Sequence, residues 1–209
     1  ANLTVNSPMR LGDSLSLNLL KTTGSEYERV GYMIPVGSNG WRLGAHASNM
    51  NYQLQGSFAS SDGHGTSKTT GLDASYPIVR SQQENLNLSW IYDSKSMTNY
   101  SAGSVSSDYG IRAMSISLAG NRIDTWMGGG LTTATTTLTN GRNNLGTDVT
   151  TANTTGNYSK LVFNLSRQQS LTERTSGFAS VTSQYANKNL DGSEKLFVAG
   201  ANGVRAYQG

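Results

Sequence analysis

The sequence of 209 residues contains no cysteine, 3 prolines and 2 histidines. The lack of cysteine excludes a disulfide scaffold, a thiolate zinc site and a cysteine nucleophile. Hydrophobic residues make up 35% and charged residues 14%, both below the usual values of about one half and one quarter for a globular enzyme. No apolar run reaches about 18 residues, so no helix in this sequence can cross a bilayer. A soluble protein or a membrane β-barrel remains.

The charges are also sparse and scattered. The 16 basic and 13 acidic residues give a net charge of +3 without any block of one sign, so the sequence carries no footprint for binding nucleic acid. Gly, Ser, Thr and Asn are abundant instead. These residues disfavour helices and supply turns, and their alternation with Leu, Val and Tyr predicts an all-β fold.

Strict alternation of apolar and polar residues recurs along the chain. Leu15, Leu17 and Leu19, for example, are separated by polar residues, which places them on one face of a strand. We predict about nine strands of about ten residues, after a first strand that is cut short, at 13–20, 28–36, 41–48, 68–78, 85–93, 112–121, 131–139, 158–167 and 175–186. Residues 1–5 already alternate like a strand and lack the features of a signal peptide, so we expect none there.

The predicted connections differ in length on the two sides of the sheet. Short polar turns are expected at 6–12, 37–40, 80–83, 124–128 and 169–172, whereas longer segments are expected at 56–66, 94–108, 141–156 and from 186 onward, with 21–25 the short exception. Tight turns on one rim and long loops on the other are typical of outer-membrane barrels. We therefore predict a single-domain antiparallel transmembrane β-barrel whose polar lumen explains the low hydrophobicity.

Few residues suggest site chemistry. His46 and His64 lack partners at metal-ligand spacing, and we expect no metal site, no cofactor and no catalytic residues. His46 is expected to line the polar lumen. Asp73 and Asp93 fall on the polar faces of neighbouring predicted strands, where they could act as a general acid and base or simply line the lumen.

The most distinctive stretch lies at the end of the sequence. Residues 189–195 read Asn-Leu-Asp-Gly-Ser-Glu-Lys, and Val204, Arg205, Ala206 and Tyr207 follow in a glycine-rich segment. An arginine among apolar and aromatic residues indicates either a loop folded inward, whose guanidinium pairs with a carboxylate, or a loop that ends at the surface.

Together with segments 6–13, 31–37, 75–80 and 128–131, this stretch resembles the TpsB family, the outer-membrane transporters of bacterial two-partner secretion. Residues 204–207 are similar to that family's Val-Arg-Gly-Tyr motif, with Ala206 in place of the usual glycine. The resemblance implies a fragment of about nine to ten strands out of about sixteen. Residues 1–209 would form a single partial barrel domain, from the end of the second strand to the sixth loop.

The resemblance also implies a function. The family secretes, with activation in some members, a large haemolysin- or haemagglutinin-like exoprotein without ATP. The two periplasmic POTRA domains that capture the unfolded exoprotein, and the later strands, lie outside this chain. Arg205 would anchor the sixth loop in the lumen to an acidic residue on a later strand, with Val204 and Tyr207 as packing neighbours. The implied partners are the exoprotein and outer-membrane lipid, with a monomeric barrel and no nucleic acid.

Two other functions remain open from the residues. A general diffusion porin would have the same strands, but it would not account for the motif at residues 204–207. A soluble all-β adhesin or carbohydrate-binding module would account for the Asn and Thr content. It would require the apolar faces to pack against each other.

Overall fold

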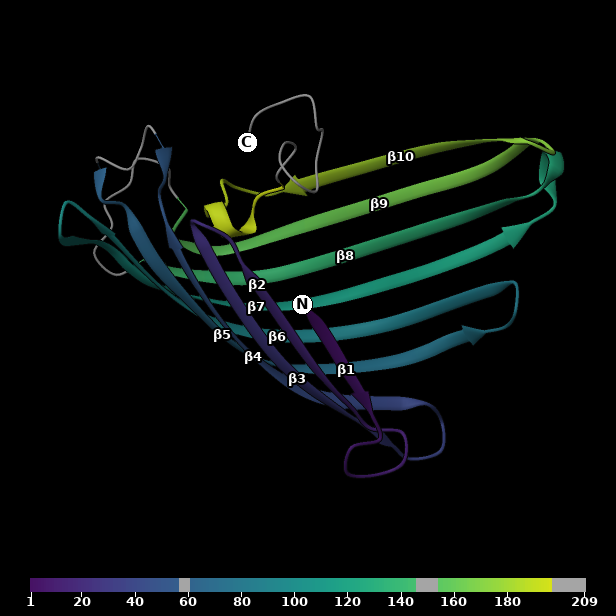
Figure 1. Ribbon diagram of the computed structural model, residues 1–209, viewed down its shortest axis with the longest axis horizontal. Coiled ribbons are helices and arrows are strands. Elements are labelled where there is room, and N and C mark those ends of the chain that lie inside the picture. Colours follow the sequence, from purple (N-terminus) through teal and green to yellow (C-terminus); the bar gives the residue numbers. More distant parts are fainter. Residues whose placement is uncertain (57–60, 146–153, 197–209) are drawn as a thin grey trace.

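Ten β-strands form one antiparallel sheet in which every strand pairs with its neighbours in the sequence (Figure 1). The computed structural model describes residues 1–56, 61–145 and 154–196. The strands are β1 (Asn2–Asn6), β2 (Ser14–Lys21), β3 (Ser25–Val36), β4 (Trp41–Gln53), β5 (His64–Arg80), β6 (Glu84–Ser101), β7 (Ser104–Asp124), β8 (Gly130–Leu145), β9 (Gly156–Thr172) and β10 (Thr175–Ala186). Two short 3-10 helices, η2 (Trp126–Gly128) and η3 (Gly192–Glu194), complete the described elements. Within these ranges, no helix has the length and apolar character needed to cross a membrane.

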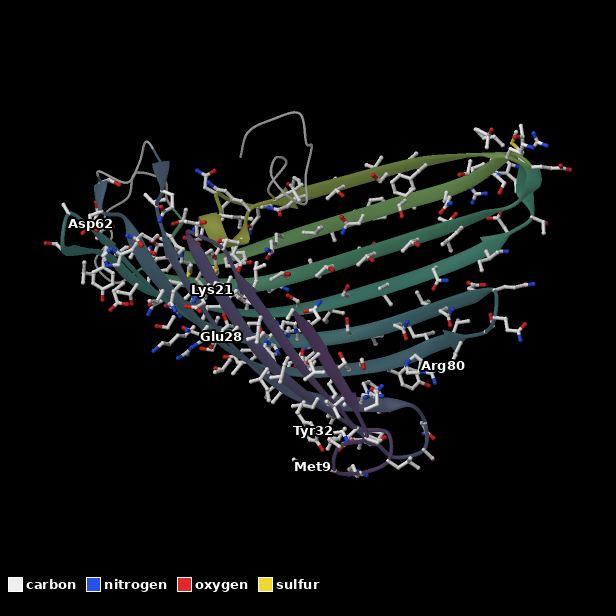
Figure 2. All side chains as sticks on the ribbon, in the orientation of Figure 1. Met9, Lys21, Glu28, Tyr32, Asp62 and Arg80 are labelled. Atoms are coloured by element: carbon white, nitrogen blue, oxygen red, sulfur yellow. The ribbon has the colours of Figure 1, made fainter. Side chains whose placement is uncertain are left out.

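The connections alternate between two rims of the sheet. One rim carries the connections 7–13, 37–40, 81–83, 125–129 and 173–174, and we call it the short-turn rim. The other rim carries the connections 22–24, 54–63, 102–103 and 146–155 and the segment that follows β10. Figure 2 shows Met9 and Arg80 at the short-turn rim and Lys21 and Asp62 at the opposite one.

The predicted strands are present, but several extend further than the sequence indicated. The prediction of a long connection at 94–108 is wrong, because β6 continues to Ser101 and β7 begins at Ser104. Ala102 and Gly103 make the turn between them, both with positive φ (50° and 75°), as two-residue hairpin turns of this type require. The extensions were missed because Ser, Thr and Asn occupy both faces there, which leaves no hydrophobic alternation to detect.

A conventional hydrophobic core is small in the described residues. Its buried members are Ile111 of β7, Tyr158 of β9 and Leu190, which lies in the segment after β10. Met97, Tyr109 and Ala186 pack against them. Large apolar residues elsewhere in the sheet are mostly exposed. The fold therefore buries apolar side chains mainly where the segment after β10 lies on the sheet.

Candidate functional site: the polar face and the segment docked on it

The two faces of the sheet differ in chemistry and in exposure. The strand registers place one set of large apolar side chains on a common face, which we call the apolar face: Leu17, Val30, Leu43, Leu72, Trp90, Ile116, Leu138 and Leu161. Ile116 and Leu138 are 43% and 46% exposed. On the opposite polar face, Thr139 is 3% and Asn143 is 1% exposed. This is the reverse of a water-soluble sheet, in which the apolar face would be covered.

Hydroxyl groups line much of the polar face. Ser115 and Ser117 of β7 lie in hydrogen-bonding distance of Thr139 and Thr137 of β8, each pair 2.8 Å apart between the oxygen atoms. Hydroxyl side chains act both as donors and as acceptors. Ser115, Ser117 and Thr137 are partly exposed, so their hydroxyl groups can bind water or a polypeptide backbone, whereas Thr139 is buried.

A histidine lies between two carboxylates on the polar face. His46 of β4 has its Nδ1 atom 2.7 Å from Oδ2 of Asp73 on β5 and its Nε2 atom 3.0 Å from Oδ1 of Asp93 on β6. The His46 side chain is 2% exposed, whereas those of Asp73 and Asp93 are 17% and 26% exposed. The imidazole therefore joins three adjacent strands, and the carboxylates remain partly open to the polar face.

Gly71 makes this arrangement possible. It is the register partner of both His46 and Asp93, so it lies between them in the sheet. A Cβ atom at Gly71 would lie 2.5 Å from Cε1 of His46 and 2.5 Å from Oδ1 of Asp93. Any side chain at this position would displace the imidazole.

The segment after β10 folds back onto the polar face. Its 3-10 turn, η3, is capped by Asp191, whose carboxylate accepts hydrogen bonds from the Ser193 backbone N–H at 2.9 Å and from the Ser193 hydroxyl at 2.7 Å. The Asp191 carboxylate also accepts a hydrogen bond of 2.9 Å from the Tyr109 hydroxyl of β7. Such side-chain caps favour the turn over an extended chain. The turn is thereby fixed to the sheet.

Glu194 provides the strongest attachment of this segment. Its side chain is 4% exposed, and its two oxygen atoms accept hydrogen bonds from Lys95 Nζ at 2.5 Å and Lys160 Nζ at 2.6 Å. Burial favours the neutral carboxyl, but the two ammonium groups outweigh it and hold the pKa of Glu194 below its usual value. We call Glu194 with Lys95 of β6 and Lys160 of β9 the lysine clamp.

Leu190 adds an apolar contact beside the lysine clamp. It is 4% exposed and packs against Ile111 and Tyr158. Burying a leucine side chain stabilises a contact by about 1.5–3 kcal/mol. Charge, hydrogen bonds and apolar packing thus all attach residues 187–195 to β6, β7 and β9.

Some of the predicted site residues lie in the described part of the chain and others do not. Val204, Arg205, Ala206 and Tyr207 lie outside the described residues. Residues 189–195, singled out in the sequence for their resemblance to the family's sixth loop, lie within the docked segment 187–195. Asp73 and Asp93 lie on the polar face as expected.

The sequence reasoning missed the partners of these groups. His46 was expected to line the polar lumen and has no partner at metal-ligand spacing in the sequence, yet it contacts both Asp73 and Asp93. The signal available in the sequence was that His46, Asp73 and Asp93 fall on the same face of adjacent predicted strands. No sequence feature indicated the lysine clamp, because Lys95 and Glu194 are 99 residues apart. In the described ranges, no group of three or more His, Cys, Asp or Glu residues is arranged to hold a metal ion.

Comparison with known proteins identifies similar chains. The family model of haemolysin secretion/activation proteins ShlB/FhaC/HecB matches residues 1–209. The heme/hemopexin transporter protein HuxB of Haemophilus influenzae (strain 86-028NP) is 25% identical over 218 residues, which cover 100% of this chain and 38% of HuxB.

Two solved structures share the fold. CdiB from Escherichia coli superposes with a TM-score of 0.76 at 19% sequence identity, covering 99% of this chain and 40% of CdiB. CdiB from Acinetobacter baumannii gives a TM-score of 0.70 at 18% identity, covering 99% of this chain and 38% of that protein. The chain therefore spans about two fifths of the length of these relatives. The predicted all-β antiparallel barrel fragment is confirmed.

Proposed function

Because the chain belongs to the haemolysin secretion/activation family ShlB/FhaC/HecB, the TpsB outer-membrane β-barrel transporters of two-partner secretion, we propose that it forms part of the wall of a protein-secreting pore. The cargo is a large haemolysin- or haemagglutinin-like exoprotein that crosses unfolded and without ATP. The role is transport and not catalysis. POTRA domains elsewhere in the transporter capture the exoprotein on the periplasmic side.

The observation that carries this proposal is the reversed polarity of the sheet. Ile116 and Leu118 are 43% and 44% exposed on the apolar face, while the hydroxyl groups of Ser115 and Ser117 are paired on the polar face. A bilayer accepts such an apolar surface, and the closely paired strands satisfy the backbone groups that lipid cannot. In this proposal the apolar face contacts outer-membrane lipid and the polar face lines the pore, and the complete barrel is a monomer.

The polar face also suits an extended cargo. An unfolded polypeptide carries N–H and C=O groups that are not paired within the chain, and the hydroxyl groups along β7 and β8 can exchange hydrogen bonds with them in place of water. Such bonds are individually worth about 1 kcal/mol net. The chain can therefore slide along the wall without being trapped.

In this proposal, residues 187–195 are the fixed base of the sixth loop. The lysine clamp and Leu190 hold this base on β6, β7 and β9. Arg205 acts further along the loop as its anchor in the lumen, with Val204 and Tyr207 packing beside it and Ala206 at the tip. The acidic partner of Arg205 lies on a later strand of the complete barrel.

A porin and a soluble adhesin or carbohydrate-binding module each explain fewer of the structural observations. A porin uses the same polarity but has no use for a loop base attached by two lysines and a buried glutamate. A soluble adhesin or carbohydrate-binding module requires the apolar side chains to be covered, whereas Leu43 and Leu72 are 44% and 53% exposed.

The test replaces Arg205 by alanine in the complete transporter and measures the exoprotein in the culture medium. We expect secretion to be lost while the barrel still inserts in the outer membrane, as judged by its resistance to extraction and protease. Arg205→Lys is the matched control, because it keeps the charge but loses the planar guanidinium. Normal secretion by Arg205→Ala would refute the role of Arg205, and conductance with small-solute selectivity but no exported protein would favour a porin.

A further inference from the structure

Two arginines face each other on the apolar side of the sheet near the rim opposite the short turns. Arg112 of β7 and Arg142 of β8 are direct register partners, and both are exposed. The next register pairs toward the short-turn rim on the same face are Met114 with Asn140 and Ile116 with Leu138. The arginine pair therefore lies at the boundary of the apolar band, where a membrane-spanning strand meets lipid headgroups.

No carboxylate neutralises this pair in the described part of the chain. The row continues through Ser94 on β6 and Asn157 on β9, neither of which is acidic. The nearest acid on the same face of β7 is Asp108, four residues away, or about 13 Å along the strand. Like charges directly opposite on adjacent strands destabilise a sheet. The described residues therefore supply no anion for Arg112 and Arg142, and the pair is stabilised once an anion binds between them.

The opposite end of the same face is built differently. There Arg122 is the register partner of Glu84. Arg167 Nη1 and Nη2 donate hydrogen bonds of 2.8 and 2.9 Å to the carboxylate of Asp124. Arg122 and Arg167 thus have acidic neighbours within the protein, which sets Arg112 and Arg142 apart.

A hollow of about 320 Å³ lies beside the arginine pair. It is lined by Ser94, Lys95, Gly110, Arg112, Arg142 and Asn144. Gly110 is the register partner of Asn144 in the next row outward, and its missing side chain leaves room above the guanidinium groups. Hydroxyl, amide and two guanidinium groups converge there, and the planar guanidinium matches the oxygen atoms of a phosphate.

We infer that Arg112 and Arg142 bind the phosphate of a membrane lipid headgroup in the leaflet opposite the short turns. The inference rests on the proposed function, because it requires the apolar face to be covered by lipid. The site takes a lipid and not a free anion, since its continuation toward the short-turn rim is the apolar surface of Met114, Ile116 and Leu138. Acyl chains can lie on that surface while the headgroup occupies the hollow.

The test compares variants of the complete transporter purified from outer membranes in detergent, with lipid retention measured by native mass spectrometry and by phosphorus analysis. Arg112→Gln/Arg142→Gln should reduce lipid affinity by about tenfold for each arginine. Arg122→Gln is the matched control on the same strand and face, and it should keep the lipid. Insertion and exoprotein secretion are measured on the same samples, so a failure of the proposed function is seen separately from a failure of lipid binding.

Washing with inorganic phosphate distinguishes the source of the anion. Retained lipid adducts that resist the wash, and that disappear in the double variant, support the site. Equal lipid retention by the double variant, or equal loss in Arg122→Gln, would overturn it. Bound phosphorus that the wash exchanges, with no lipid mass attached, would overturn it as well, since the pair would then hold only a free anion.

Discussion

The lysine clamp gives the sharpest prediction for the docked segment. Glu194→Gln keeps the shape of the side chain but removes the charge that holds Lys95 and Lys160. Removing one partner of a fully buried ion pair destabilises by about 3–5 kcal/mol. Here the lysine side chains are 21% and 15% exposed, so water can solvate the unpaired ammonium groups and reduce this cost. We expect undocking to become easier by about 2–3 kcal/mol, or roughly 30- to 160-fold.

Cysteine labelling measures this effect directly. Leu190 is 4% exposed, and the chain has no cysteine of its own, so Leu190→Cys provides one buried thiol that a maleimide reaches only after undocking. The parent and the Glu194→Gln variant both carry Leu190→Cys in a cysteine-free transporter, and they differ only at Glu194. The labelling rate should rise by the factor given above.

The control variant is Glu26→Gln, which breaks the ion pair of 3.0 Å with Lys21. The side chains of Lys21 and Glu26 are 78% and 45% exposed, and such surface pairs contribute about 0–1 kcal/mol. Its labelling rate should therefore stay close to that of the parent. A rate within twofold of the parent for Glu194→Gln, or an equal rise for Glu26→Gln, would refute the reasoning.

The same clamp predicts a dependence on pH. Because docking lowers the pKa of Glu194, its contribution is fully present above the ordinary glutamate pKa of about 4.3 and is lost as the pH falls through the lowered value. Hydrogen exchange of residues 187–195, corrected for intrinsic rates, should report constant protection at neutral pH and a loss of protection in acid. Glu194→Gln should lack this acid transition.

Two further predictions test the faces of the sheet. Ile116→Arg on the apolar face should destabilise the inserted barrel by about 2–4 kcal/mol, whereas Ser117→Arg on the polar face should be tolerated; equal effects on insertion would contradict the assignment of the faces. Gly71→Ala should displace His46 from Asp93, because the new Cβ would lie 2.5 Å from both, and lower stability by about 1–3 kcal/mol. A urea unfolding midpoint unchanged from that of the parent would show that the imidazole is not held there.

The strands were predictable because a sheet with one apolar and one polar face requires the two kinds of residue to alternate with a period of two. Leu15, Leu17 and Leu19 carried that signal, and β2 lies there. β7 is 21 residues long, about twice what a bilayer span requires, and its outer part has no apolar face to produce a pattern. The ends of the strands at the rim opposite the short turns therefore could not be predicted from alternation.

The contacts within the candidate site were less predictable. The alternation of faces along the strands placed Asp73 and Asp93 on one face. The link through His46 depends on a register that brings Gly71 between His46 and Asp93. Lys95 and Lys160 show no local feature that distinguishes them from other lysines. Their role follows only from where the segment after β10 turns back, which is a property of the folded sheet.

The order of the strands also has a consequence for folding. Each strand from β1 to β10 pairs only with strands adjacent in the sequence, so the sheet can grow one hairpin at a time with short loop closures. The attachment of Glu194 to Lys95, 99 residues away, cannot form until β6 to β9 stand side by side. Docking of this segment is thus a late step in assembly, and it occurs only on a sheet whose registers are already correct.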